Sequence, residues 1–260
     1  MKHLLFVLFI LLAPTLIAQN TAIGTNEKLI YTASYNMSGL MTEIAQVTME
    51  TGQVKTSKAT LLHLKCSAAT YTKWDSFFKI RDLYESYVSP TSLIPFLYKR
   101  DINEGNYYKF MQYTFSHKTN SVKSLMRKKN SKGVIYDKQN TIKINGGTKD
   151  IVSTIYNIRN LDISKAATGD VKSFKVLFDN KEMVINVKYL GKETLATALG
   201  KKECYKLALS LQNNSILKGS TSDNLLYLTA DANKIPVYAK FKIPVGNGEL
   251  KIKSASGLKN

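Results

Sequence analysis

The sequence is poor in the residues that build metal and catalytic sites. It contains three histidines and two cysteines in 260 residues. Protein zinc sites usually draw on histidine and cysteine together, so this shortage argues against a metal centre. The chain also has no H-E-x-x-H motif, no G-x-S-x-G elbow and no glycine-rich phosphate loop. We therefore predict no catalytic residues, no metal and no cofactor.

Arginine is also rare, although the chain is strongly basic. Lysine and arginine together number 37 against 19 acidic residues, which gives a formal net charge of +18. The arginines are Arg81, Arg100, Arg127 and Arg159. Lysine is a solvated point charge, whereas a bidentate grip on phosphate favours arginine. Nucleic acid is therefore not an expected partner, and an anionic lipid or glycan of the cell envelope is the more plausible one.

No apolar run is long enough to span a bilayer, which takes about 20 apolar residues in a helix. The longest run covers residues 4–17, follows a short basic start and is interrupted by Pro14. A small residue, Ala18, comes just before a polar stretch, and this is the layout of a cleaved secretory signal. We predict that residues 1–18 are a signal peptide and that 19–260 form one β-rich domain. The protein would be exported, and either periplasmic or secreted, with no membrane span.

The two cysteines would meet an oxidising compartment, where a disulfide can persist. Strand alternation places Cys66 on the same face as Leu64, whereas Cys204 lies opposite the apolar set of its own strand, which includes Tyr205. A disulfide needs Cβ atoms about 4 Å apart. The sequence therefore favours two free thiols, although it leaves a bridge open.

The chain is rich in short segments that alternate apolar and polar residues. Examples are KLIYTASY at 28–35, YYKFMQYTF at 107–115 and CYKLALSL at 204–211. Turn-forming pairs and triplets such as Asp179-Asn180 and Gly246-Asn247-Gly248 separate them. Strands at this spacing, with these turns, indicate an antiparallel protein. The predicted fold class is mainly β, a twisted antiparallel sheet that forms a half-barrel or barrel.

Two segments depart from this alternation and predict helices packed on the sheet. In residues 148–160, Ile151, Ile155 and Ile158 share one helical face, and Thr148 can cap the helix. Residues 72–80 predict a shorter helix with its aromatic side chains turned inward. Apolar stripes at helical spacing usually face a core, and a lid over a cleft is the alternative.

An acidic residue, Asp231, lies between two apolar runs in LTADANKIPVYAKF, residues 228–241. Aspartate and asparagine form turns because their side chains bond nearby backbone groups. Pro236 marks a strand start or an edge strand. A paired-carboxylate mechanism would need a second acid beside Asp231, and the neighbour is Ala230. We therefore interpret Asp231 as a turn residue.

Five segments in order carry a family resemblance. They are NEKLIYTASYNMSGL (26–40), FFKIRDLYESYVSPTSLIPFLYKRDINEG (77–105), TKDIVSTIYNIRN (148–160), YLGKETLATALGKKECYKLALS (189–210) and LYLTADANKIPVYAKFKIPVGNGELK (227–251). The chain resembles the DUF3108 family, exported bacterial proteins without an assigned biochemical function. The resemblance implies export and a mostly β fold, and it implies no catalytic residues. Many relatives have a second acid where Ala230 stands, so a function of such an acid pair would be compromised here.

Two clusters of side chains are candidates for ligand binding. Residues 107–115 place Tyr107, Tyr113 and Phe115 on one strand face, where they could line a concave groove or fill a core. A lysine-rich stretch, 118–138, contains Lys123 and Arg127. It could be a solvated strand face or could contact anionic headgroups or polysaccharide. We predict these five residues as the ligand-binding set.

Three functions remain in competition at this stage. The leading one is a non-catalytic binding or assembly module for a lipid, a lipoprotein or a glycan. The second is a hydrolase of an envelope polymer, with His117 and either Asp101 or Glu104 as first suspects, because a triad can assemble from distant positions. The third is a purely structural partner of another protein, which predicts an exposed apolar patch or sheet edge.

Overall fold

The computed structural model describes residues 19–37, 39–212, 222–243 and 246–260; the predicted signal peptide, 1–18, lies outside them. Its strands form one open antiparallel sheet in the order β8-β7-β6-β5-β4-β3-β2-β1-β14-β13-β12-β11-β10-β9. Their bounds are Lys28–Met37 (β1), Leu40–Lys55 (β2), Thr60–Thr70 (β3), Arg81–Val88 (β4), Pro95–Glu104 (β5), Tyr107–Ser116 (β6), Ser121–Lys129 (β7), Ile135–Lys143 (β8), Val171–Phe178 (β9), Lys181–Thr197 (β10), Gly200–Leu211 (β11), Leu225–Thr229 (β12), Pro236–Ile243 (β13) and Gly246–Ser256 (β14). The predicted mainly β, antiparallel fold class is confirmed.

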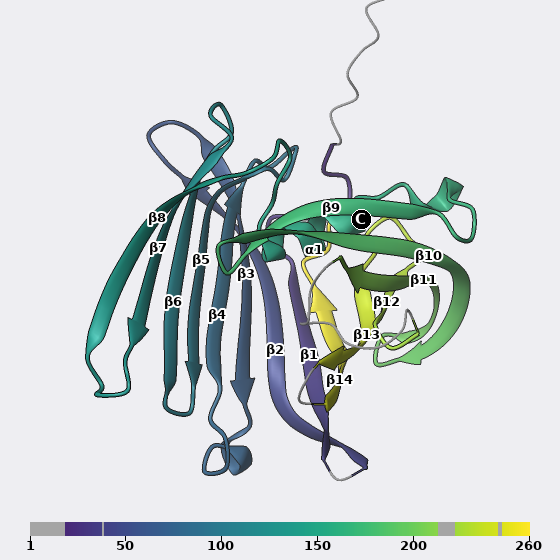
Figure 1. Cartoon of the computed structure of the whole chain (residues 1–260). Coiled ribbons are helices and arrows are strands. Elements are labelled where there is room, and N and C mark those ends of the chain that lie inside the picture. Colours follow the sequence, from purple (N-terminus) through teal and green to yellow (C-terminus); the bar gives the residue numbers. More distant parts are fainter. Residues whose placement is uncertain (1–18, 38, 213–221, 244–245) are drawn as a thin grey trace, which may run out of the picture.

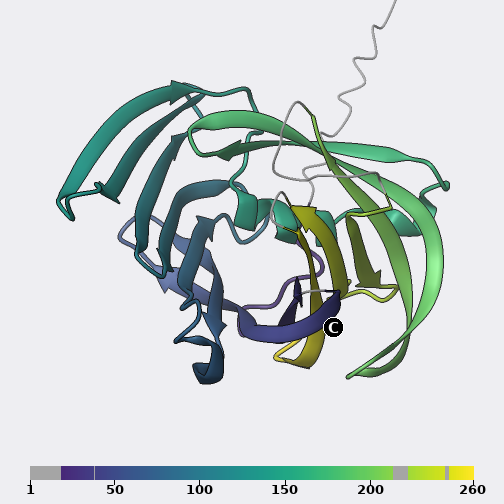
Figure 2. The same ribbon diagram turned by 60° about the horizontal axis from the view of Figure 1, so that its bottom comes forward.

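The sheet consists of two meanders joined at β1 and β14. Each strand from β1 to β8 pairs with its chain neighbour, and so does each strand from β9 to β14. The two sets meet where β1 pairs antiparallel with β14. Figures 1 and 2 show that the sheet curves strongly and that the β9–β10 hairpin crosses over α1. The result resembles a half-barrel, with β8 and β9 as its two edges.

The helix α1, Ile151–Arg159, lies within the bend of the sheet (Figure 2). It confirms the helix predicted over 148–160, with narrower bounds. Asp150 caps it, because its side chain accepts a hydrogen bond from the amide of Ser153 at 2.8 Å. Thr148, the cap expected from the sequence, instead donates to Glu182 on β10 at 2.5 Å. The Asp150 carboxylate also accepts from the Ser86 hydroxyl of β4 at 2.6 Å, which ties the helix to the sheet.

The second predicted helix, 72–80, was wrong. Only Thr72–Trp74 form a turn of 3₁₀ helix, and none of these three residues is buried. Phe77 is 75% exposed and Phe78 is 47% exposed, so neither faces the core. Polar contacts shape this loop instead: Asp75 accepts from the Thr70 hydroxyl and binds Arg81 at the start of β4. Such contacts compete with helical hydrogen bonding.

The face of the sheet that packs against α1, called the inner face, holds the core. Val152 and Tyr156 of the helix lie in one cluster with Tyr31, Leu64 and Tyr98. A second cluster joins Ile158 to the strands β9 to β12. Because paired residues across a sheet share a face, register extends this assignment from strand to strand. The opposite side is called the outer face.

A buried ion pair fixes the end of the helix. Arg159 donates to both carboxylate oxygens of Glu27, at 2.6 and 2.7 Å, and both side chains are fully buried. Arg159 also donates to the backbone carbonyl of Asn233 in the β12–β13 turn. The pair therefore links three segments: the chain before β1, the helix, and the C-terminal meander.

Candidate functional site

The five predicted ligand-binding residues are divided between the two faces of the sheet. Tyr113 pairs with Ser124, whereas Thr114 pairs with Lys123 and Phe110 with Arg127. Tyr107, Tyr113 and Phe115 of β6 therefore lie on the inner face, and Lys123 and Arg127 lie on the outer face. The structure does not bring the five together, so they cannot contact one small ligand simultaneously. Their role in binding stays a prediction.

The inner face at β5, β6 and β7 is covered rather than open. The tip of the β9–β10 hairpin lies on it, and the backbone amide of Asn180 donates to the Tyr113 hydroxyl at 2.9 Å. Asn180 also accepts from Ser124 at 2.7 Å. Burial raises the pKa of Tyr113 to about 12. Phe115 is buried beside Tyr113, and Tyr107, at the start of β6, is half exposed.

An ionic contact holds the hairpin tip in place. Asp179 binds Arg100 of β5 and accepts from the Lys109 ammonium at 2.6 Å. Burial opposes ionisation of Asp179, but the hydrogen bonds and charges of these two cations hold its pKa below the usual value. Asp179 and Asn180 both have positive φ, 47° and 64°, a conformation that these residue types tolerate in a tight hairpin turn. We call this contact the hairpin latch.

The predicted basic residues lie on a solvated strand face. Arg127 forms a bidentate pair with Asp137 of β8 at 2.7 and 2.9 Å, and both side chains are at least 40% exposed. Lys123 is exposed at the edge of a shallow hollow between β7 and β8. Part of this charge is therefore already neutralised within the protein.

The residues suspected of hydrolase chemistry are far apart. His117 follows the end of β6, and its Nε2 lies 2.6 Å from the carbonyl of Pro95. Asp101 pairs with Phe110 and Glu104 with Tyr107, toward the other end of the same hairpin. Seven residues of strand separate Phe110 from His117, which is about 23 Å at the rise of a β-strand. His117 and these acids do not form one site.

Both cysteines are free thiols, as the sequence favoured. Cys66 pairs with Met49 and Tyr84 on the inner face, whereas Cys204 pairs with Glu193 on the outer face. Burial raises the pKa of Cys66 to about 12 and that of Cys204 to about 11. Neither thiol is therefore activated as a nucleophile.

Asp231 is a turn residue, as predicted. One carboxylate oxygen accepts from the Thr229 hydroxyl at 2.8 Å and from the amides of Asn233 and Lys234 at 3.0 Å each. These are the contacts of a side chain that closes a loop on itself. Its three bonds support the β12–β13 connection, whose Asn233 carbonyl receives Arg159.

A buried carboxyl group lies on the inner face near the β5–β6 turn, and the sequence analysis missed it. Burial, together with the nearby carboxylates of Glu104 and Asp101, raises the pKa of Asp82 to about 6. The Asn103 amide, which donates to Asp82 at 3.0 Å, opposes this shift. The signal was present in RDLYESYV, where Asp82 shares a face with apolar Tyr84.

Replacing Asp82 by asparagine should stabilise the protein at neutral pH. A carboxyl pKa that is higher in the folded than in the unfolded chain adds stability at low pH, and this stability is lost as pH rises through about 6. Asparagine mimics the protonated group, so D82N should be more stable than the wild type by about 1–2 kcal/mol near pH 7.5. Urea unfolding at about pH 7.5 and about pH 4.5 checks this, because the difference should be much smaller at the lower pH, closer to the unfolded pKa of about 3.9. A difference independent of pH would contradict the assignment.

A groove of about 680 Å³ lies between the tip of the β10–β11 hairpin and the sheet. Its walls include Leu195 and Ala198 at the tip, and Thr32, Tyr238 and Lys251 on β1, β13 and β14. Thr32 and Tyr238 both pair with Lys251, so these three side chains share the outer face. We call this cavity the outer groove.

A bulge in β10 lets the hairpin bend over the outer face. The register with β11 shifts between Tyr189 and Gly191, and Gly191 has φ of 110°. Such a bulge bends a strand and increases its local twist. Leu195, beyond the bulge, packs against the core cluster, which also contains the fully buried Cys204.

The chemistry of the outer groove is amphipathic. Leu195, Ala196 and Ala198 give it an apolar wall, and Tyr71 and Tyr238 add aromatic rings. The Tyr238 hydroxyl donates to Glu249 at 3.0 Å, and burial with this carboxylate raises its pKa to about 12. Lys251, which also binds Glu249, lines the groove with Lys253 and with one acid, Glu43. A ligand with an apolar part and an anionic group would match this wall.

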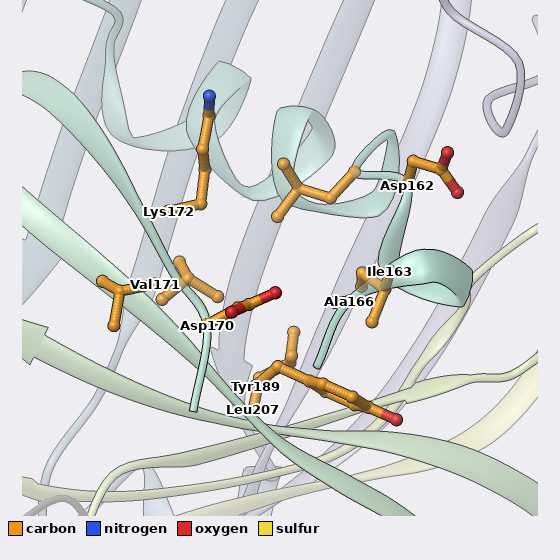
Figure 3. A pocket seen from close by; sticks show the side chains of 10 residues that line it. Asp162, Ile163, Ala166, Asp170, Val171, Lys172, Tyr189 and Leu207 are labelled. Atoms are coloured by element: carbon orange, nitrogen blue, oxygen red, sulfur yellow. The ribbon is translucent and has the colours of Figure 1, made fainter. Parts of the chain in front are cut away.

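A smaller cavity of about 300 Å³ lies between the loop after α1 and the strands β9 to β11 (Figure 3). Its acidic residues serve the loop itself. Asp162 binds Lys165 at 3.1 Å, and Asp170 accepts from the amide of Ala167 at 2.9 Å. Tyr189 and Leu207 form its floor on the inner face. This cavity is less suited to an anionic ligand than the outer groove.

Two further findings concern the part of the chain that the structure describes. It contains no group of three or more histidine, cysteine or acidic side chains placed to hold a metal ion. It also contains no helix with the length and apolar character needed to cross a membrane.

The outer groove could not be found from alternation alone. Strand alternation predicts that Glu193 and Leu195 share a face. Which residues that face contacts depends on the bend in the hairpin. The available signal was Gly191 within a long alternating run, since an isolated glycine in a strand suggests a bulge.

Three solved structures are similar to this chain, and the first of them shares its fold. A beta-barrel-like protein of the DUF1849 domain of unknown function, from Brucella abortus, covers 89% of this chain and 97% of its own, with a TM-score of 0.56 and 7% identity. A candidate exported protein with a YmcC-like fold from Bacteroides fragilis has a TM-score of 0.36, 8% identity, and coverage of 89% and 95%. A candidate lipoprotein from Parabacteroides distasonis has a TM-score of 0.30, 10% identity, and the same coverage.

A sequence search of curated proteins gave no match. A protein-family model, described as a protein of unknown function, DUF3108, matches residues 30–253. The match runs from β1 to β14 and so includes both meanders, α1 and the outer groove. The chain therefore belongs to the DUF3108 family.

Proposed function

We propose that the protein is an exported, non-catalytic binding module of the cell envelope, which holds an amphipathic anionic lipid or the acylated segment of a lipoprotein in its outer groove. The observation that carries this proposal is the groove itself, a cavity of about 680 Å³ with an apolar wall and two lysines. Small-molecule sites in proteins are typically about 300–1,000 Å³ and mostly apolar, with a few polar groups that orient the ligand.

The arrangement of charge supports an anionic ligand. Lys251 and the Tyr238 hydroxyl both bind Glu249. Lys253 also lines the groove and lies on the same face of β14 as Lys251. An acyl chain would lie against Leu195 and Ala198, and its phosphate or carboxylate would lie near the lysines. A glycan is less well matched, because the hairpin tip offers mainly apolar side chains and its Thr197 hydroxyl already donates to the carbonyl of Gly200.

The covered inner face supports placing the ligand outside. Tyr98 and Tyr113 are each 1% exposed, so a ligand bound at the β6 aromatic side chains would have to displace the hairpin latch. Displacing it would separate Arg100 and Lys109 from the Asp179 carboxylate, although both cations are nearly buried. Leaving a buried charge without its partner is costly. The outer groove needs no such rearrangement.

A substitution that fills the groove tests the proposal. A198W should weaken binding of lysophosphatidylglycerol about tenfold or more, because the indole would fill the space beside the apolar wall. A tenfold loss of affinity corresponds to about 1.4 kcal/mol of binding free energy. The matched control is T194W on the same hairpin, since Thr194 is exposed and does not line the groove. Binding is measured by native mass spectrometry of the purified protein.

Equal binding by both variants and the wild type would contradict the proposal, and so would no binding by the wild type. Native mass spectrometry of protein purified from its own compartment adds a second readout, in which the wild type and T194W should carry a copurifying mass that A198W lacks. If neither readout shows a ligand, the structural-partner hypothesis becomes the better account. The open edge of β8, almost fully exposed, would be its contact surface.

A further inference from the structure

Large exposed apolar side chains gather at one end of the β1–β8 meander. Among the described residues, twelve such side chains are exposed, and eight of them lie at the tips of four hairpins. The eight are Leu40, Met41, Phe77, Phe78, Tyr107, Val134, Ile135 and Tyr136. Since scattered exposed apolar residues are normal but contiguous ones mark interaction sites, this clustering calls for an explanation.

The topology places these tips side by side. In a meander of paired neighbours, the β1–β2, β3–β4, β5–β6 and β7–β8 connections all fall at the same end. The Gly105 amide of the β5–β6 turn donates to the carbonyl of Lys79 in the β3–β4 loop at 2.8 Å. Seven strand spacings separate β1 from β8, so the tips follow the curved sheet over about 34 Å. We call this row of tips the rim (Figure 1).

Lysines surround the apolar side chains of the rim. Lys73 and Lys79 belong to the β3–β4 loop, and Lys128, Lys129 and Lys132 surround the β7–β8 turn. The carboxylates at these tips are fewer. Asp75 and Asp137 are already paired with Arg81 and Arg127, which leaves Glu43 and Glu104. The rim therefore combines apolar side chains with a net positive charge.

The opposite end of the same meander lacks this combination. Its connections carry only Ile94 and Phe96 among the exposed large apolar side chains that the structure describes. The Phe96 ring packs edge-on against His117, with centroids 6.0 Å apart. Lys58 and Lys118 lie at this end without an apolar cluster. The apolar and basic character is thus a property of one end and not of strand ends in general.

From this asymmetry we infer that the rim docks on the surface of an anionic phospholipid bilayer. Phe77, Phe78 and Leu40 would enter the boundary between headgroups and acyl chains, where aromatic and aliphatic side chains of peripheral proteins lie. The lysines would meet headgroup phosphates, and each basic residue near an anionic surface adds to the attraction. The strands would then stand upright on the membrane, with the outer groove on the side of the molecule.

The shape of the rim favours a bilayer over a folded partner. Its apolar side chains sit on separate tips along a row, and each can enter a fluid surface independently. A folded protein would have to present four matching hollows at fixed spacing. The positive charge complements an anionic surface without requiring a particular arrangement of acids. The inference is independent of what the groove binds.

The single tryptophan of the chain lies on the rim and supplies a direct probe. Trp74 is in the β3–β4 loop, three residues before Phe77, and its indole nitrogen donates to the carbonyl of Glu43 at 2.9 Å. The experiment uses protein without residues 1–18, which mass spectrometry verifies. This protein should float with vesicles rich in phosphatidylglycerol and should not float with phosphatidylcholine vesicles. Brominated acyl chains in the bound vesicles should quench Trp74.

Double variants at the rim and at the opposite end distinguish contact through the rim from the general attraction of a basic protein to an anionic surface. F77S/F78S and K129E/K132E should each weaken flotation about tenfold or more, because they remove apolar contact and reverse charge at the rim. K58E/K118E makes the same charge change at the opposite end and should weaken it far less. The groove variant A198W should float like the wild type. Circular dichroism confirms that each variant is folded.

Three results would overturn the inference. They are equal flotation with both lipid compositions, an equal loss in K129E/K132E and K58E/K118E, and unquenched Trp74 in vesicles that carry the protein. If F77S/F78S fails to fold, the charge-reversal pair decides the question alone.

Discussion

Replacing Arg159 by methionine should lower the free energy of unfolding by about 3–5 kcal/mol, the cost of leaving a buried charge without its partner. The variant would leave the Glu27 carboxylate without its partner, because this fully buried group accepts hydrogen bonds from Arg159 through both oxygens. It would also leave the carbonyl of Asn233 without the guanidinium that it accepts from. For a domain of ordinary stability this is a large share of the total.

The control for R159M is a double substitution, E27L/R159M. Two apolar side chains of similar volume can replace a buried ion pair at little cost, because neither charge then needs desolvation. The double variant should therefore recover most of the stability that the single variant loses. Urea unfolding followed by circular dichroism measures both. A double variant as unstable as R159M would show that the lost packing, and not the unpaired charge, dominates.

Replacing Asp179 by asparagine should cost about 2 kcal/mol, because it leaves two cations without their carboxylate. The effect is smaller than at Arg159, since the Asp179 side chain is 45% exposed and solvent screens it, although Arg100 and Lys109 are only 5% and 11% exposed. Asparagine keeps the positive φ of 47° that the turn requires, so the substitution isolates the charge. Urea unfolding provides the measurement.

The sign of its pH dependence follows from the lowered pKa of Asp179. A carboxyl pKa lowered on folding contributes stability that is present above the unfolded value, about 3.9, and is lost as pH falls through the folded value. The difference between wild type and D179N should therefore be full at neutral pH and shrink in acid. D137N, which breaks the exposed pair with Arg127, is the matched control and should change stability by less than about 1 kcal/mol. Equal losses in D179N and D137N would refute the latch.

The strands could be predicted from the sequence because their signal is local. Alternation in KLIYTASY or YYKFMQYTF depends only on the pleat of a strand, and Asp179-Asn180 specifies its turn through φ. The helix at α1 was predictable for the same reason, since Ile151, Ile155 and Ile158 repeat at helical spacing. The family resemblance rested on such local segments, and the family model confirms it.

The β3–β4 loop shows where local reasoning fails. Trp74, Phe77 and Phe78 are spaced for a helical face, but Asp75 bonds the Thr70 hydroxyl and Arg81 instead, and the loop turns its phenylalanines to solvent. The sequence alone favoured burial because exposed phenylalanine is uncommon in a soluble protein. Their exposure is understandable if this end of the molecule meets a membrane.

The candidate site depended on long-range geometry. Tyr113 and Lys123 are ten positions apart, and only the register of β6 with β7 reveals that they face opposite ways. The outer groove depends on the bulge at Gly191 and on the pairing of β1 with β14, which joins segments over two hundred residues apart. No pattern within a single segment encodes that pairing.

Hydrogen–deuterium exchange, with and without lysophosphatidylglycerol, tests the central claim most directly. If the ligand lies in the outer groove, amides in 194–199 and 250–253 should gain protection while those in 107–115 remain unchanged. Protection confined to 107–115, with opening of the turn at Asp179, would instead place the ligand on the inner face and contradict the account.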